Sequence, residues 1–220
     1  MKGRWISLIA AASDLFLGTS CYGCGRPGYL LCPPCRHDLS VEPICGRIAG
    51  IPTCAALSYE PPWSQLIIAH KERGAWNLAT LLGMGLATAV EYVENEKPPL
   101  LIPVPSSRTS IRQRGYDHAW ALAKVAASHL GYRAEHLLER IGDVEDQCGL
   151  SREERYSRQI ATMRIATQGS DEYSPLTGTE VIVVDDIITT GASVTEAVRA
   201  LSQQGCHVVG IAAICQVIRR

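Results

Sequence analysis

One short segment, residues 181–193, constrains the fold more than any other part of the chain. It opens with an apolar β-branched run over residues 181–184, which is typical of a central strand in a parallel sheet. Two adjacent carboxylates, Asp185 and Asp186, follow the run, and apolar residues at helical spacing come after the next turn. A second apolar run then covers residues 207–214. Strand, helix and strand in this order predict a βαβ unit of an α/β fold.

The two carboxylates and the turn after them indicate a ligand site. Adjacent charges at the end of a buried strand are costly unless something uses them, and ligands of open α/β sheets bind at that edge. Paired carboxylates can accept hydrogen bonds from the vicinal hydroxyls of a ribose. The polar turn from Thr189 to Ser193 leads into a helix, whose first amides favour phosphate. The segment therefore predicts a site for a ribose 5-phosphate. The alternative, an acidic N-cap, would explain one aspartate but not two.

Length and composition set the outer limits. The chain has 220 residues, enough for one α/β domain and a small appendage. Hydrophobic residues make up 46% and charged residues 20%, which is typical of a soluble globular protein. The formal net charge of -1 gives no reason to expect non-specific binding to nucleic acid. Arginines nevertheless cluster within residues 108–114 and 152–164, so local basic patches remain open.

The N-terminus superficially resembles a signal peptide, because Lys2 and Arg4 precede an apolar run. Asp14 interrupts this run, no clear cleavage site follows, and the run is too short to span a bilayer. We interpret residues 1–17 as an amphipathic helix packed on the protein, with export or membrane association as the alternative. This interpretation predicts a cytoplasmic protein without a membrane span.

Periodicity predicts the rest of the organisation. Residues 18–56 are rich in glycine, proline and cysteine and form the expected cysteine-rich zinc module, whereas residues 57–220 form the expected α/β domain. Further helices are expected over residues 63–73, 75–93 and 117–130 and from Ser151, and strands over residues 100–104 and 133–138.

Four of the nine cysteines form two C-x-x-C pairs. Each pair presents two thiolates on one tight turn, and two such turns can close a tetrahedral Zn²⁺ site that has no open position and is therefore structural. A redox pair and an iron–sulfur centre are the alternatives, but neither has its usual surroundings here. Cys45 or Cys54 could replace one ligand. The four expected ligands are Cys21, Cys24, Cys32 and Cys35.

The segment at residues 181–193 resembles the signature loop of type I phosphoribosyltransferases at every position. The whole chain resembles the ComF family, whose members join a cysteine knuckle to a phosphoribosyltransferase-like domain. The resemblance runs from about Cys21 to Cys215. Weaker supporting elements occur in the family's order at residues 59–62, 70–74, 102–105, 114–117 and 147–150, and at Arg155.

The resemblance implies an α/β fold: a parallel-sheet core like that of type I phosphoribosyltransferases, with a small N-terminal zinc-binding module. It implies that Asp185 and Asp186 hold the ribose hydroxyls of 5-phosphoribosyl 1-diphosphate (PRPP), with Mg²⁺ bridging the diphosphate and the ribose. The implied cradle for the 5-phosphate consists of Thr189, Thr190, Gly191, Ala192 and Ser193. The candidates beside the diphosphate are Lys71, Arg73, Ser106, Ser107, Arg108 and Arg114.

Three functions are compatible with this reading. The first is a phosphoribosyltransferase that acts on an unknown acceptor. The second is a ComF-like accessory protein of DNA uptake, which keeps the ligand loop without turnover and binds single-stranded DNA or competence proteins. The third is a regulator that senses PRPP. No general base is evident, because a helix start explains Tyr116 and His118 at least as well, and no hood for recognising a base is recognisable.

Overall fold

The computed structural model describes residues 20–37, 42–93, 97–141, 162–166 and 176–218, and the statements below concern these residues. The expected helix over residues 1–17 and the one expected from Ser151 lie outside them. So do most of the second arginine cluster and the segment 147–150.

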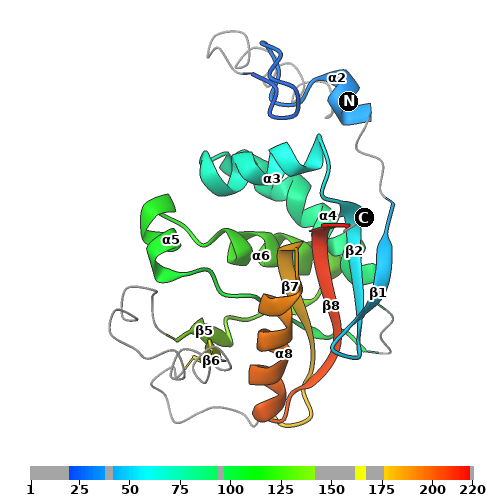
Figure 1. The fold of residues 1–220 in the computed structure, drawn as a ribbon, viewed down its shortest axis with the longest axis vertical. Helices are drawn as coiled ribbons and strands as arrows, with labels where there is room; N and C mark the ends of the chain where they lie inside the picture. The colour runs from blue at the N-terminus through cyan, green and yellow to red at the C-terminus, as the bar shows by residue number, and fades with distance from the viewer. Residues whose placement is uncertain (1–19, 38–41, 94–96, 142–161, 167–175, 219–220) are drawn as a thin grey trace.

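A six-stranded sheet forms the centre of the molecule, with the strand order β1-β2-β8-β7-β3-β4 (Figure 1). Strand β1 pairs antiparallel with β2, and the other four pairings of this sheet are parallel. The expected central parallel strand is confirmed as β7, which lies between β8 and β3. The strands are β1 (Ile44–Ile48), β2 (Ile51–Ser58), β3 (Leu100–Pro103), β4 (Arg133–Ala134), β7 (Glu180–Ile188) and β8 (His207–Gln216).

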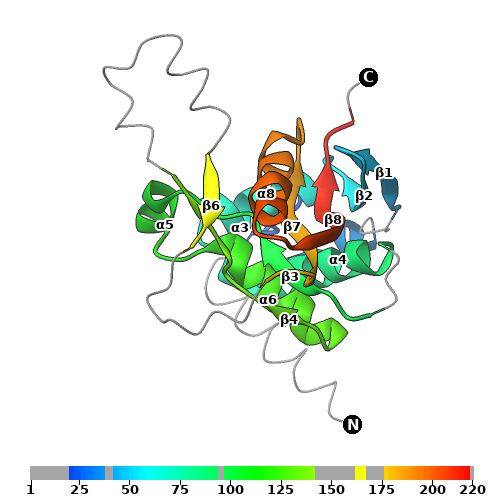
Figure 2. The ribbon, with the colours of Figure 1, turned by 90° about the horizontal axis from the view of Figure 1, so that it is seen from below.

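Helices cover both faces of the sheet (Figure 2). Along β7, Ile182 and Val184 pack in one apolar core with α3, α4 and α6, while Val181 and Val183 pack in another with α8. This alternation is the period of two of a strand buried on both sides, and it explains the continuous apolar run in the sequence. The helices are α2 (Pro33–His37), α3 (Trp63–Glu72), α4 (Ala79–Glu91), α5 (Arg108–Arg114), α6 (His118–Leu130) and α8 (Ala192–Gln203), with a 3₁₀ turn η1 (Trp76–Leu78) before α4.

The predicted βαβ unit is confirmed, since α8 connects β7 to the parallel neighbour β8. The helix α5 lies between the strand expected over residues 100–104 and the helix expected over residues 117–130, where the sequence predicts no helix. The side chain of Ser107 caps α5 by accepting a hydrogen bond of 3.0 Å from the amide of Ser110, and Gly115, with a φ of 76°, ends it. This local cap stabilises a helix of seven residues, none of which is buried. The segment therefore has no apolar periodicity from which a helix could be predicted.

The boundary expected between residues 56 and 57 falls inside β2. Residues 44–56, which the composition assigned to the cysteine-rich module, instead form β1 and most of β2 and extend the sheet next to β8. Burial explains this, because Thr53 to Leu57 are buried in succession between the faces of the sheet. The cysteines, proline and glycine of this stretch are typical of loops, so the composition did not predict a strand.

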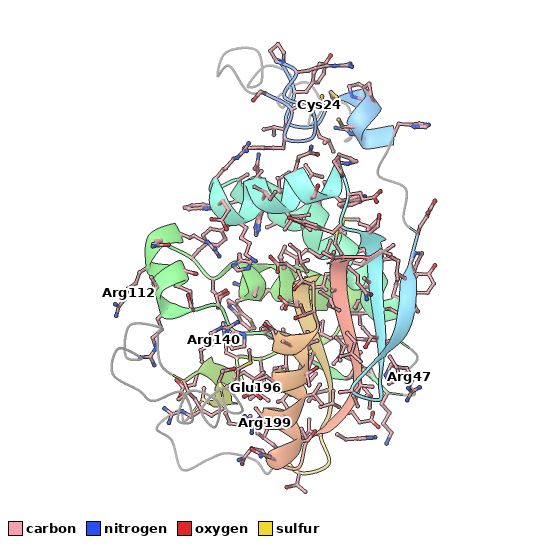
Figure 3. All side chains as sticks on the ribbon, in the orientation of Figure 1. Cys24, Arg47, Arg112, Arg140, Glu196 and Arg199 are labelled. Carbon is pink, nitrogen blue, oxygen red and sulfur yellow. A yellow bond between two sulfur atoms is a disulfide. The ribbon has the colours of Figure 1, made fainter. Side chains whose placement is uncertain are left out.

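A second, two-stranded sheet lies beside the main one and consists of β5 (Leu138–Arg140) and β6 (Met163–Ile165). The single strand expected over residues 133–138 is therefore divided between two sheets. Glu196 of α8 holds β6 in place by accepting hydrogen bonds from the amides of Thr162, at 2.7 Å, and Met163, at 3.1 Å. Arg199 fixes that carboxylate from the same helix (Figure 3).

Helices α4 and α6 approach closely at Gly83, where a Cβ atom would lie 2.5 Å from two carbons of Val125. We expect Gly83→Ala to lower the free energy of unfolding by about 1–3 kcal/mol through overpacking. Gly85→Ala in the same helix is the matched control. Its Cβ would lie 3.6 Å from Ile214, so helix propensity should raise the free energy by about 0.5–1 kcal/mol. Urea denaturation measures both, and equal effects would contradict the close approach.

Candidate functional site

A cavity of about 330 Å³ lies at the carboxyl ends of β3 and β7. The ends of α3 and α5, the starts of α6 and α8, and strand β5 complete its wall. Parallel strands bring their carboxyl ends to one edge, so residues far apart in the sequence meet there. The lining comprises Lys71, Val104, Pro105, Ser106, Ser107, Ser110, Arg114, His118, Arg140, Asp185, Asp186, Ile187, Thr189 and Ser193.

A larger hollow of about 1110 Å³ lies between α4 and α6, but it contains none of the residues predicted from the sequence. Its lining is mostly apolar and includes four alanines, Met84 and Trp120. The smaller cavity combines two carboxylates, three cationic side chains and several hydroxyl groups. Convergent polar groups mark a binding site better than volume does, so we take the smaller cavity as the candidate site.

The two aspartates lie inside the strand and not at its end, which corrects the sequence-based boundary. Strand β7 continues to Ile188, because Ile187 and Ile188 still pair with β8. Successive side chains of a strand point to opposite faces. Asp186 is accordingly buried, with 3% of its surface exposed, whereas Asp185 is half-buried, although both line the cavity.

Asp186 is already paired within the protein. Its Oδ2 atom lies 2.9 Å from Nζ of Lys71 and 3.3 Å from Nε2 of His118. Burial alone would raise the pKa of Asp186, but the hydrogen bond from His118 and the charge of Lys71 outweigh it and hold that pKa well below its usual range. The carboxylate is therefore ionised at neutral pH and two of its hydrogen bonds are taken.

His118 links this carboxylate to the basic side of the cavity. Its Nδ1 atom lies 3.0 Å from an Nη atom of Arg114 and 3.2 Å from Oγ of Ser106. A guanidinium group can only donate, so Nδ1 accepts and Nε2 carries the proton that is donated to Asp186. The network thereby assigns the tautomer of His118 and engages both of its ring nitrogens.

Asp185 has the opposite electrostatic environment. Burial, followed by the negative charge of Asp186, raises the pKa of Asp185 well above its usual value. The amide of Asp186 donates a hydrogen bond of 2.9 Å to Oδ1 of Asp185 and offsets part of this effect. Neighbouring carboxyl groups whose pKa values are shifted in opposite directions have different roles. Here Asp186 carries a fixed negative charge, whereas a bound ligand or cation can change the protonation of Asp185.

Three cationic side chains surround the rest of the cavity: Lys71, Arg114 and Arg140. Arg114 also forms an ion pair of 3.0 Å with Glu72, and Arg140 donates from Nε to the carbonyl of Pro105 at 2.8 Å. Sequence reasoning missed Arg140, which comes from the three-residue strand β5 and belongs to no pattern that we recognised. Figure 3 shows it between α5 and the β5–β6 sheet.

Two predicted cations do not reach the cavity. Arg73 is exposed at the end of α3. Arg108 has 71% of its side chain exposed and lies 3.4 Å from Glu139. The two predicted serines do line the cavity, and Ser107 also caps α5. The expected diphosphate side is therefore represented by Lys71, Ser106, Ser107 and Arg114, together with the unexpected Arg140 and Ser110.

The predicted phosphate loop forms the turn between β7 and α8. Thr189 and Ser193 line the cavity, whereas Thr190, Gly191 and Ala192 do not. The Oγ1 atom of Thr190 accepts a hydrogen bond of 3.3 Å from the amide of Ala192. Gly191 is the N-cap of α8 and has a φ of 80°, a conformation that favours glycine. The turn therefore brings the first amides of a twelve-residue helix to the cavity edge.

The four cysteines of the C-x-x-C pairs form one cluster, in which all sulfur atoms lie within 4.8 Å of one another. They are held on the turns before and at the start of α2, above α3 in Figure 3. The amide of Cys32 donates to Sγ of Cys21 at 3.3 Å. Burial raises the pKa of Cys21, but amide groups directed at its sulfur outweigh this effect and lower that pKa to about 6. The cluster can hold a metal ion such as zinc.

Cys45 and Cys54 are not part of this cluster. They lie opposite each other in the β1–β2 pair and are joined by a disulfide, so neither serves as the alternative ligand that the sequence left open. The cluster itself rests against the main domain. A Cβ atom on Gly23 would lie 3.1 Å from Pro62 at the start of α3, and Tyr22 packs on the core.

Comparison with known proteins agrees with this fold. Residues 124–220 match the phosphoribosyl transferase domain family. Over 203 residues the chain is 25% identical to the DNA utilization protein YhgH of Salmonella typhimurium, covering 90% of this chain and 84% of that protein. It is 23% identical over 203 residues to the competence protein ComFC of Bacillus subtilis, covering 84% and 78%.

Among solved structures, glutamine PRPP amidotransferase from B. subtilis superposes with a TM-score of 0.42 and 18% identity. The match covers 63% of this chain but only 26% of that one, so the chain spans about a quarter of that enzyme.

The domain match and the parallel sheet with its β7–α8 turn define a phosphoribosyltransferase-like protein with the type I fold. The chain is similar along most of its length to the DNA utilization and competence proteins, and this similarity, together with the four-cysteine cluster, supports a ComF-type phosphoribosyltransferase-like protein. No helix of the part that the structure describes is long and apolar enough to cross a membrane.

A buried histidine beside the site gives a prediction about pH. His70 has 1% of its surface exposed, and its Nε2 atom has no hydrogen-bond partner among the residues that the structure describes. Burial and then the neighbouring His118 lower its pKa to about 4. The unfolded chain takes up this proton near pH 6.5, so stability is fully present above that pH and is lost as the pH falls towards 4.

We expect this group to account for about 3 kcal/mol of acid destabilisation. Replacing His70 by phenylalanine should therefore flatten the dependence of the free energy of unfolding on pH between 6.5 and 4. His129→Phe is the control, because His129 is exposed on α6 and its loss should leave the slope unchanged. The result is read from urea denaturation at several pH values. An unchanged slope in the His70 variant would contradict the assignment.

Proposed function

We propose that the protein binds PRPP with Mg²⁺ in the cavity at the ends of β3 and β7 and transfers its phosphoribosyl group to an acceptor. One observation carries the proposal: a single cavity combines the two aspartates of β7, Thr189 and Ser193 on either side of the β7–α8 turn, and three cationic side chains. These are the groups that a ribose, a phosphate and a diphosphate require.

The proposed roles follow from position. Asp185 is the carboxylate still open to the ribose hydroxyls or to Mg²⁺, because Asp186 is paired with Lys71 and His118. Thr189 and Ser193, with the first amides of α8, surround the 5-phosphate. The diphosphate lies towards Ser106, Ser107, Arg114 and Arg140. Thr190, Gly191 and Ala192 shape the turn without lining the cavity.

Transfer would proceed by displacement of diphosphate from the anomeric carbon, with positive charge developing on the ribose ring. The protein's own contribution is positioning of the two reactants and neutralisation of the leaving diphosphate by Arg114, Arg140 and Lys71. Mg²⁺, when bound, would add charge between the diphosphate and the ribose. Its expected ligands are oxygens, for which Asp185 is the available side chain.

The cysteine cluster is proposed to hold a structural Zn²⁺, since four thiolates without an open position suit that ion. Elemental analysis of the purified protein should find one zinc per chain, and a chain without metal would exclude this role.

The proposed location is the cytoplasm, because metal-binding thiols persist where thiols are kept reduced. The division of the chain that we propose is a metal module ahead of the sheet and a phosphoribosyltransferase-like domain that begins with β1.

A second function, an accessory role in DNA uptake without turnover, is favoured by a different observation. Both ring nitrogens of His118 are engaged, so the histidine nearest the aspartates is not free to take a proton from an acceptor. The names of the relatives, DNA utilization protein and competence protein, agree with such a role. PRPP binding without release of diphosphate, together with a mobility shift of single-stranded DNA, would support this role over transfer.

A pair of arginine variants tests the binding proposal. Arg140→Ala removes a cation from the cavity and is expected to weaken PRPP binding about 10-fold or more, the cost of losing a charge-assisted hydrogen bond. Arg112→Ala is the matched control, because Arg112 is exposed on α5 outside the cavity (Figure 3). Calorimetric titration of PRPP with Mg²⁺ into the metal-loaded protein gives both affinities. Equal weakening in both variants, or no binding to the native protein, would refute the proposed site.

A further inference from the structure

The hairpin β1–β2 carries a pair of cysteines that the proposed function does not use. Cys45 and Cys54 face each other in the antiparallel register and are joined by a disulfide. Cys45 is exposed, whereas Cys54 has only 4% of its surface exposed. Thiol–disulfide exchange needs access to one of the two cysteines, and Cys45 is the exposed one, on the outer strand of the sheet.

The structure also contains a hydrogen-bond acceptor for the reduced form of Cys54. Sγ of Cys54 lies 3.5 Å from the carbonyl oxygen of Tyr92, which follows α4. A disulfide sulfur has no proton to donate, so only a free Cys54 thiol can use this acceptor. The fold therefore accommodates the disulfide and also offers the free Cys54 thiol a hydrogen-bond acceptor.

Strand β1 also touches the proposed phosphate loop. A Cβ atom on Gly191 would lie 3.3 Å from Cδ1 and 3.4 Å from Cγ2 of Ile48, so this isoleucine packs directly against the N-cap of α8. Ile48 is the last residue of β1 and joins the same apolar core as α8. Ile48 is therefore the side chain that packs against the backbone of the turn at this position.

Little else holds β1 in place. Among the described strands it pairs with β2 alone, and its three central residues, Cys45, Gly46 and Arg47, are exposed. Within the described part of the chain, its other attachments are the backbone pairing, the half-buried Ile44 and Ile48, and the contact of Arg47 with the carbonyl of Gly50 in the turn. The disulfide is thus the one covalent tie across this hairpin.

We infer that Cys45 and Cys54 form a reversible dithiol–disulfide site, and that its state controls how firmly Ile48 supports the turn at residues 189–193. The effect on ligand affinity rests on the proposed function; the redox site and its contact with the turn do not. In a compartment that keeps thiols reduced, a disulfide of this kind is formed and broken as a signal.

The exchange needs a partner of the dithiol class. A thiolate of the reductant attacks Sγ of Cys45, the bond between Cys45 and Cys54 breaks, and Cys54 leaves as a thiolate that takes up a proton. The second thiolate of the reductant then displaces Cys45, which is protonated in turn. Two electrons and two protons pass to the protein, and the reductant becomes a disulfide. An oxidised dithiol carrier reverses the reaction.

The first experiment tests the site itself. Full-length, metal-loaded protein is alkylated with iodoacetamide before and after treatment with dithiothreitol. The protein is then digested, and mass spectrometry gives the masses of the peptides that contain Cys45 and Cys54. We expect both to be protected before reduction and both to be alkylated after it. Alkylation of both without reductant, in protein handled under air, would overturn the inference.

The second experiment tests the contact with the turn, by hydrogen exchange at the amides of residues 189–193. The double variant Cys45→Ser/Cys54→Ser stands for the reduced state without exposing the cysteine cluster to reductant. We expect its turn amides to exchange at least about fivefold faster than those of the oxidised protein, and PRPP to bind at least about fivefold more weakly. Identical exchange in the two proteins would overturn the coupling.

Two single variants show whether Ile48 is the link. Ile48→Ala should exchange as fast as the double variant and should no longer respond to dithiothreitol. Ile44→Ala, at the other half-buried position of β1, should keep the response. A full response in the Ile48 variant would overturn the role of this side chain. If PRPP binds neither redox form, the proposed function fails, whereas the exchange result still decides the present inference.

Discussion

The buried carboxylate of Asp186 is the interaction on which the arrangement of the site depends. A charge with 3% of its surface exposed must be compensated, and Lys71 and His118 do so at 2.9 and 3.3 Å. Lys71 fixes the end of α3 and His118 fixes the start of α6, while Arg114 connects His118 to the end of α5. One ionised group on β7 thus connects three helices at the same edge of the sheet, and Asp185, beside it, is the carboxyl group that we propose binds the ligand.

Two further parts of the chain bear on this edge from outside. The four-cysteine cluster packs on Pro62 at the start of α3, the helix whose last turn carries Lys71. The hairpin β1–β2 reaches the opposite side of the site through Ile48 and Gly191. The cysteine cluster and the disulfide-bonded hairpin therefore each contact an element that lines the cavity, without lining the cavity themselves.

Local patterns predict part of this structure and chain topology determines the rest. The apolar run at residues 181–184 and the helical spacing after it correctly predict β7, α8 and β8. The contact of Lys71 with Asp186 spans 115 residues of sequence, so no local pattern reports it. Arg140 enters the cavity from a strand of three residues, too short for a periodic signal. The residues of β1 and most of β2 were assigned to the cysteine-rich module, because their cysteines, glycine and proline are not typical of a buried strand.

The central claim is that the two aspartates differ, with Asp186 fixed as a charge and Asp185 open to the ligand. The most direct test is the number of protons exchanged when PRPP and Mg²⁺ bind, measured by calorimetry in two buffers of different ionisation heat. Because burial and the charge of Asp186 raise the pKa of Asp185, binding should release a proton that is missing in Asp185→Asn and reduced in Asp186→Asn, which lacks that charge. The same proton count in the native protein and in Asp185→Asn would contradict the account.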